Sequence, residues 1–106
     1  MKKFVNKETE IVKEVKEGQV KVMMGYADLA LIGLNGQPKE GWDFAIMRKR
    51  IKTIDKMEKL AALEFGKSID LEDAEFDTVI ECSNIKWAMF HRDLIAYDDY
   101  LQGLKK

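Results

Sequence analysis

Cys82 and His91 carry the side chains best suited to nucleophilic chemistry, and each is the only residue of its type in the chain. A cysteine–histidine pair can form an activated nucleophile, and both side chains can also bind zinc. A structural zinc site needs about four ligands, however, and the cysteine and histidine content cannot supply them. Because Cys82 lies in a helical pattern, we expect it to be a small packing residue.

His91 also begins the tetrapeptide His-Arg-Asp-Leu, which matches part of the catalytic loop of protein kinases. A kinase also needs a glycine-rich loop and a metal-binding asparagine, and Asp98 occupies the position of that asparagine. The chain, with 106 residues, is also far too short for a kinase. We therefore predict that a helix begins near His91, and we predict no enzymatic activity, no cofactor and no catalytic residue.

Acidic residues are concentrated just after residue 69. They resemble a cation-binding cluster, but the glycine and the terminal bidentate glutamate of a calcium loop are missing. Carboxylates also suit the first turn of a helix, where they favour the positive end of the helix dipole. We predict no metal site and interpret these residues as helix capping plus a solvent-exposed acidic patch. The residues are Asp70, Glu72, Asp73, Glu75 and Asp77.

Residues 48–59 form a basic segment with six basic and two acidic side chains, whereas residues 67–106 carry five basic and nine acidic ones. A basic helix face can bind phosphates, but a sequence pI of about 5.9 is low for a specific nucleic-acid-binding domain. The two segments could attract each other within one chain or between copies, and the basic face could also be a plain solvent-exposed face. We expect it to pair with an acidic surface on another copy or another protein. The two tryptophans could be core lids or exposed anchors for a partner. The predicted partner-binding residues are Arg48, Lys49, Arg50, Lys52, Lys56, Glu72, Asp73, Asp77, Trp42 and Trp87.

One long amphipathic helix over residues 43–65 is predicted to position the basic face. Its apolar residues recur every three or four positions, which indicates a single buried stripe. Asp43 suits the N-cap position, and Gly66 suits the position just after the helix, where a positive φ is common. The predicted stripe consists of Phe44, Met47, Ile51, Ile54, Met57 and Ala61.

The segment over residues 8–17 has two alternative interpretations. Alternating apolar residues on either side of Glu17-Gly18 favour a β-hairpin with a tight turn there. The glutamate and lysine content of residues 8–17 would instead suit a helix. We favour the hairpin, and we expect residues 1–8 to form a loose, flexible arm.

The remaining elements are short. We predict helices over residues 26–34, about 72–84 and about 91–102, and a loop over residues 35–41. An extended segment over residues 68–71 could pair with the hairpin. Strands followed by helices indicate an α+β fold, with an N-terminal β-hairpin and about four α-helices. Length predicts one domain over residues 1–106.

Composition limits the class of protein further. Apolar residues make up 46% and charged residues 35% of the chain, which excludes a disordered protein. No apolar run approaches the roughly 18 residues that a membrane span needs. The lone cysteine allows no internal disulfide, which is typical of a reducing compartment. We therefore expect a cytoplasmic protein that does not bind membranes.

The segment from Met47 to Leu101 resembles short, uncharacterised proteins of tailed bacteriophages and prophages. The resemblance rests on the sequences MRKRIKTIDKMEKL, IDLEDAEFDTVIE and WAMFHRDLIAYDDYL. These are structural patterns, and they carry no catalytic residues over to this chain. The resemblance implies a phage-encoded protein, which would act in the host cytoplasm or in the virion.

The sequence thus favours a non-enzymatic interaction protein that acts as an oligomer or adaptor, with a role in the virion, in assembly or in host takeover. Its partner would be another copy or another phage or host protein. One alternative is a small nucleic-acid-binding regulator that uses the basic helix over residues 48–59. A second is a counter-defence inhibitor or ligand sponge built from several copies, which depends on the phage resemblance.

Overall fold

The structure, a computed structural model, describes residues 2–13, 22–36, 41–87 and 91–105. Its elements confirm the predicted α+β fold, in which N-terminal strands are followed by four helices. In chain order the elements are β1 (Lys2–Val5), β2 (Glu8–Lys13), β3 (Val22–Gly25), α1 (Tyr26–Leu34), α2 (Phe44–Ala61), β4 (Ser68–Leu71), α3 (Asp73–Ser83) and α4 (Arg92–Leu104).

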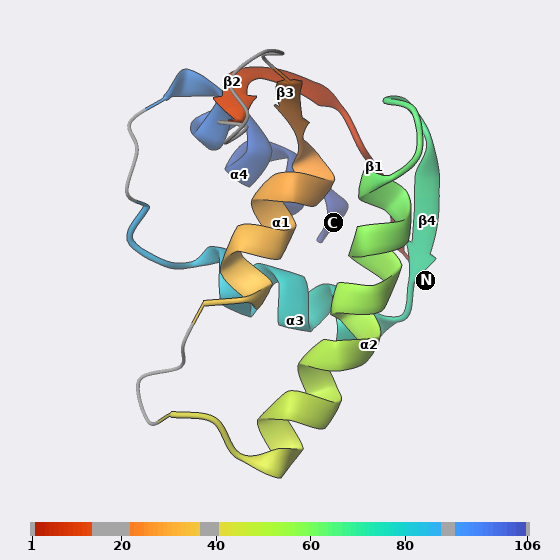
Figure 1. Ribbon diagram of the computed structural model, residues 1–106, viewed down its shortest axis with the longest axis vertical. Helices are drawn as coiled ribbons and strands as arrows, with labels where there is room; N and C mark the ends of the chain where they lie inside the picture. The colour runs from red at the N-terminus through yellow and green to blue at the C-terminus, as the bar shows by residue number, and fades with distance from the viewer. Residues whose placement is uncertain (1, 14–21, 37–40, 88–90, 106) are drawn as a thin grey trace.

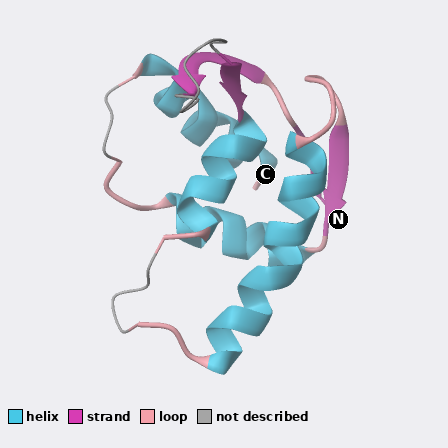
Figure 2. Ribbon diagram, viewed as in Figure 1, coloured by secondary structure: helices cyan, strands magenta, loops and turns pink. Residues whose placement is uncertain are grey.

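The helices form the body of the molecule, and the strands lie along its margins (Figure 2). In Figure 1, α2 runs along one side of the molecule and α3 crosses it, while α1 lies beside the upper part of α2. The N-terminal part of α2 extends beyond the other helices in this view. The strands form two separate antiparallel pairs, β1 with β4 and β2 with β3.

The prediction of a flexible arm over residues 1–8 is wrong, because residues 2–5 form β1. This strand pairs with β4, and Phe4 lies opposite Ile69. Phe4 is fully buried, and the neighbouring backbone N–H of Val5 donates to the hydroxyl of Tyr100, 2.8 Å away. The extended segment predicted over residues 68–71 is therefore confirmed, but its partner is β1 and not the hairpin.

Asn6 fixes the path of the chain where β1 leads into β2. Its side chain is buried, and its Oδ1 atom accepts from the backbone N–H of Ala27 in the first turn of α1 (2.9 Å). Its backbone N–H donates to the carbonyl of Lys67, and its own carbonyl accepts from Gly66. A single buried polar residue thus joins the N-terminal segment to α1 and to the turn before β4.

The predicted hairpin is confirmed as the antiparallel pair β2–β3, with Lys13 opposite Val22. The alternative helix is wrong for residues 8–13, which are in β2. The predicted turn at residues 17–18 lies outside the described residues. Thr9 closes the pair at its other end, because its buried hydroxyl donates to the carbonyl of Met24 (2.7 Å).

Helices α1 and α3 pack closely at Gly33. A Cβ atom at that position would lie 2.4 Å from the backbone oxygen of Cys82, which is closer than real Cβ contacts. Only a glycine therefore lets these helices approach so far. Helix α1 is correspondingly apolar, with Leu29 and Leu34 fully buried.

Helix α4 covers the remaining side of the core with aromatic residues. Tyr97 and Tyr100 contact Tyr26 of α1, with ring centroids 5.3 and 5.1 Å apart. Burial raises the pKa of the Tyr97 phenol, whose hydroxyl is 2.9 Å from that of Ser83. Helix α4 continues to Leu104, two residues beyond the predicted end near residue 102.

Candidate functional site

Helix α2 begins where the sequence predicts and ends earlier. The carboxylate of Asp43 accepts from the backbone N–H of Ile46 (2.8 Å), so the predicted N-cap is confirmed. The helix ends at Ala61 and not near residue 65. Gly66 does have a positive φ of 93°, but it lies in the turn that leads to β4.

The predicted buried stripe of α2 is wrong for its N-terminal half. Met57 is fully buried, and Ile54 and Ala61 pack partly against the core. Phe44, Met47 and Ile51, in contrast, are 76%, 39% and 57% exposed. The side that faces the core is centred on Thr53, Met57 and Leu60 instead. We call the exposed residues Phe44, Met47 and Ile51 the outer strip.

The physical reason is that α2 carries more apolar surface than its neighbours within the chain can cover. A residue one position away from a predicted stripe residue points about 100° around the helix. Helices α1 and α3 contact the side that includes Thr53 and Leu60. Phe44 and Met47 lie away from that side, and Ile51 lies at the edge of a groove between α2 and α3, so all three remain exposed to solvent in the single chain.

Arg50 caps the carboxyl end of α1. Its guanidinium donates to the carbonyl oxygens of Leu34 (3.1 Å) and Gly36 (2.7 Å). The same guanidinium lies over the ring of Trp42, 5.0 Å from its centroid. Trp42 is exposed, so the predicted anchor position is accessible, whereas Arg50 is engaged by the chain itself.

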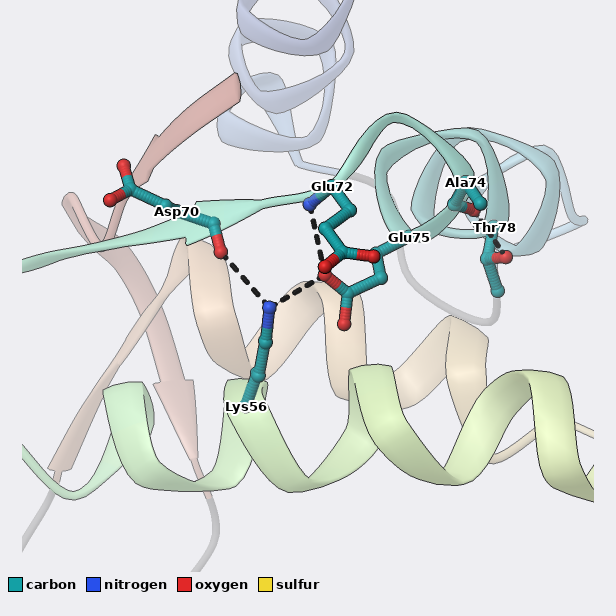
Figure 3. Close-up of polar contacts among 6 residues, drawn as sticks. All are labelled: Lys56, Asp70, Glu72, Ala74, Glu75 and Thr78. Carbon is teal, nitrogen blue, oxygen red and sulfur yellow. Dashed lines mark hydrogen bonds and ion pairs between the residues drawn. The ribbon is translucent and has the colours of Figure 1, made fainter. Parts of the chain in front are cut away.

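Two lysines of the basic face pair with helix α3 within the chain. The ammonium of Lys56 lies 2.6 Å from a carboxylate oxygen of Glu75 and donates to the carbonyl of Asp70 (3.2 Å), which Figure 3 shows. Lys49 lies 3.1 Å from the carboxylate of Glu81 on the exposed surface. Part of the charge pairing that the sequence predicts between molecules is therefore made between α2 and α3 of one chain.

Glu75 also caps α3, because its carboxylate accepts from the backbone N–H of Glu72 (2.9 Å; Figure 3). Burial tends to raise the pKa of this carboxyl, but other contributions outweigh burial. They are the hydrogen bonds from Lys56 and from the Glu72 backbone, and the positive charges of Lys56 and Lys52. The net result is a lowered pKa in the folded protein.

This lowered pKa predicts an acid-sensitive link between α2 and α3. A carboxyl whose pKa is lower when folded stabilises the fold above its unfolded pKa, and this stability is lost as the pH falls through the folded pKa. We expect Lys56→Gln to lower the free energy of unfolding by about 1 kcal/mol at pH 7. The difference from the wild type should shrink at pH 3, as urea denaturation at both pH values can measure.

Lys59→Gln is the matched control, because Lys59 lies exposed on the same helix and has no ion pair in the described residues. Its effect on the free energy of unfolding should be small at both pH values. An equal loss at pH 7 and pH 3 for Lys56→Gln would show that the Glu75 carboxylate is not the partner that matters.

Three of the remaining predicted residues, Arg48, Lys52 and Glu72, line a groove of about 540 Å³ between α2 and α3. Arg48, Lys52 and Ile51 line its α2 side, and Glu72 and Thr78 line its α3 side. The acidic residues Asp73 and Asp77 belong to α3 and are exposed. The basic and acidic surfaces are therefore adjacent in one chain, with the outer strip next to the basic one.

Trp87 is half-buried, and its ring meets that of Tyr97 edge-on, with centroids 6.4 Å apart. This contact places it as a lid on the core, which is one of its two predicted roles. It lies at the α4 side of the molecule, whereas Trp42 precedes α2.

Cys82 and His91 contribute to packing and to helix capping, respectively. Cys82 is buried in α3, and burial raises the pKa of its thiol, which makes the reactive thiolate scarce. The Nδ1 atom of His91 accepts from the backbone N–H of Asp93 (3.0 Å) at the start of α4, as the sequence predicts. The carboxylate of Asp93 in turn accepts from the backbone N–H of Glu10 (2.7 Å) and joins α4 to β2.

Asp55 is not among the predicted partner-binding residues, although it lies exposed beside the outer strip. Glu81, which pairs with Lys49, lies outside the predicted acidic patch. One signal in the sequence pointed to the outer strip itself. Phe44, Ile46 and Met47 place apolar side chains around more of the first turn than one packed side requires.

Comparison with models of known protein families, with curated proteins and with solved structures gives no match to this chain. The phage resemblance therefore stays a prediction. No group of three or more potential metal ligands comes together among the residues that the structure describes. Within the same residues, no helix has the length and apolar character that would let it cross a membrane.

Proposed function

We propose that this protein is a non-enzymatic interaction protein that acts as a homo-oligomer, with the outer strip of α2 as the contact between copies. The observation that carries this proposal is the exposure of Phe44, Met47 and Ile51 side by side on one helix. Neighbouring apolar side chains that stay in water are typical of protein–protein contacts. Burying Phe44 and Ile51 against another molecule would gain about 1.5–3 kcal/mol for each side chain.

The charges favour a second copy as the partner. The formal net charge is −1, so two copies do not repel each other strongly. The outer strip is bordered by charges of both signs, since Arg48, Asp55 and Glu58 are all exposed on α2. A symmetric contact uses the same surface twice, so a surface that carries both signs can complement itself.

The contacts within the chain favour this proposal over nucleic-acid binding. Lys49 and Lys56 lie against carboxylates of α3, and Arg50 donates to backbone carbonyls. Of the six basic residues over residues 48–59, only Arg48, Lys52 and Lys59 have neither an ion pair nor a carbonyl contact among the described residues. Phosphate binding scales with the number of free cations, so these three residues provide a weaker electrostatic footprint than the sequence suggests.

The test is the mass of the protein in solution, measured by sedimentation equilibrium over a range of concentrations. We expect the wild type to self-associate and Ile51→Glu to be monomeric at the same concentration, because a buried carboxylate would oppose the contact. Ile95→Glu is the matched control, since Ile95 on α4 is 66% exposed and Ile51 is 57% exposed. This control variant should keep the mass of the wild type.

Three results would count against the proposal. A wild type that stays monomeric at its highest soluble concentration would reject self-association. Equal loss of association in both glutamate variants would place the contact elsewhere. Duplex DNA or RNA binding that weakens steeply with salt, by a protein that stays monomeric, would favour the nucleic-acid-binding regulator instead.

A further inference from the structure

We infer that two copies pair their α2 helices antiparallel across a two-fold axis near Ile51, so that Arg48 of each copy lies beside Asp55 of the other. This inference rests on the proposed self-association and adds the geometry of the contact. It is carried by two features of α2, which are the spacing of the outer strip and two exposed charges that form no ion pair with the described residues.

The spacing suits two helices that lie side by side. Phe44, Met47, Ile51 and the half-buried Ile54 follow each other at intervals of three, four and three residues. This is the pattern by which helices form a continuous apolar seam with a second helix. Glu58 occupies the next position of the seam and is exposed, so the apolar part ends there.

Two charges next to the seam have no ion pair with the residues that the structure describes. Arg48 and Asp55 are exposed, and neither has an ion pair with another residue in the described part of the chain. Each directly follows a seam residue, Met47 or Ile54, and they are seven residues apart. They therefore lie on the same side of α2, two turns from each other.

An antiparallel pair centred on Ile51 brings these charges together. In such a pair, a residue that precedes Ile51 in one copy faces a residue that follows Ile51 by a similar number of positions in the other copy. Arg48 lies three residues before Ile51 and Asp55 lies four after it, so they meet across the contact, and symmetry repeats the pair. Met47 faces Ile54 of the other copy in the same arrangement, which covers the seam.

The two competing arrangements of the helices would form less favourable charge pairs. A parallel pair would place Arg48 beside Asp43 and Arg50 beside Asp55. Asp43 already caps α2, however, and Arg50 already donates to Leu34 and Gly36. An antiparallel pair centred between Met47 and Ile51 would bring Arg48 of one copy close to Arg48 of the other. Two like charges in that position disfavour the contact.

Disulfide trapping tests this geometry directly. Ile51→Cys should form a covalent dimer under mild oxidation, because residues at a two-fold axis come within the Cα distance that a disulfide spans. Phe44→Cys alone should stay monomeric on a non-reducing gel, since it lies two turns from the axis. A mixture of Arg48→Cys and Asp55→Cys should give the heterodimer in excess of either homodimer. The wild type, whose Cys82 is buried, is the control.

Charge reversal gives a second readout that needs no cysteine. We expect Arg48→Asp to weaken self-association about tenfold, because two copies of the ion pair are lost and replaced by repulsion. Asp55→Arg should do the same, and the double variant should recover the affinity of the wild type. Recovery would support the pairing, because two unrelated surface charges would not compensate for each other.

The outcomes separate this inference from the proposed function. Suppose that the wild type self-associates and that Ile51→Glu is monomeric. If Phe44→Cys then cross-links to itself as readily as Ile51→Cys, the helices are parallel. The antiparallel geometry is then rejected, while the proposed self-association stands. Cross-linking of Met47→Cys with Ile51→Cys in preference to Ile51→Cys with itself would place the axis between those residues and would also overturn the inference. A monomeric wild type would remove both proposals.

Discussion

Replacing Gly33 by alanine is expected to lower the free energy of unfolding by about 2 kcal/mol or more, even though alanine is the better helix former. The reason is the close packing of α1 on α3, where the new Cβ would lie 2.4 Å from the backbone oxygen of Cys82. Backbone atoms of a packed helix cannot move aside as the end of a side chain can. The two helices must therefore separate, and the contacts of Leu34 and Val79 in the core loosen with them.

Urea denaturation of Gly33→Ala and Gly103→Ala measures this effect against a matched control. Gly103 also lies in a helix, but a Cβ there would meet nothing within 4 Å. Gly103→Ala should therefore raise the free energy of unfolding, by up to about 1 kcal/mol. If both substitutions stabilise the protein, α1 and α3 do not pack at the distance described. If Gly33→Ala does not fold on its own, the same substitution in a background with the stabilising Gly103→Ala tests the same contact.

The second large effect concerns Phe4, which the sequence places in a loose arm. We expect Phe4→Ala to lower the free energy of unfolding by about 3–5 kcal/mol, because it empties a fully buried aromatic site. Phe4 also meets the ring of Tyr100 at a centroid distance of 5.8 Å, so the cavity would open between β1 and α4. Urea denaturation, followed by the circular dichroism of the helices, measures the loss.

Lys3→Ala is the control for Phe4→Ala, since Lys3 is the exposed neighbour in the same strand. Its effect should stay within about 0.5 kcal/mol. Phe4→Leu should fall between the two and keeps the test available if the alanine variant does not fold. Equal stability of Phe4→Ala and Lys3→Ala would mean that the N-terminal segment is the loose arm after all.

Phe4 illustrates why strand β1 could not be predicted from the sequence. Met-Lys-Lys-Phe-Val has no alternation long enough to mark a strand, and Asn6 and Lys7 follow at once. The strand exists because its partner, β4, lies more than sixty residues away, and because Tyr100 supplies a hydroxyl for the N–H of Val5. The local pattern over residues 68–71 indicates an extended segment, but nothing in it specifies a partner so far away, and residues 2–5 carry no strand pattern of their own.

Helix α2 shows a different limit. Its existence and its start at Asp43 follow from local chemistry, namely apolar residues at helical intervals and a carboxylate that can accept from the first turn. Periodicity alone gives two overlapping apolar sides, one through Met47 and Ile51 and one through Thr53, Met57 and Leu60. The choice between them depends on where α1 and α3 lie, which is a tertiary property.

The charges follow the same division. The sequence correctly places a basic face before an acidic patch, and it leaves open whether they meet within one chain or between copies. The fold brings Lys56 to Glu75 and Lys49 to Glu81, and it turns Arg50 toward the end of α1. Arg48 and Asp55 form no ion pair with the described residues. Their importance for a contact between copies follows only from the tertiary structure, which pairs Lys49 and Lys56 within the chain.

By itself, the sequence determined the α+β class, the four helices, the hairpin and the Asp43 cap, because each depends on residues that are near neighbours in the chain. The tertiary structure alone decided that Phe4 belongs to the core and that Phe44, Met47 and Ile51 do not. Burial of a side chain depends on which distant segment covers it, and no local pattern specifies that segment. The exposed strip on which the proposed function depends is therefore a product of packing.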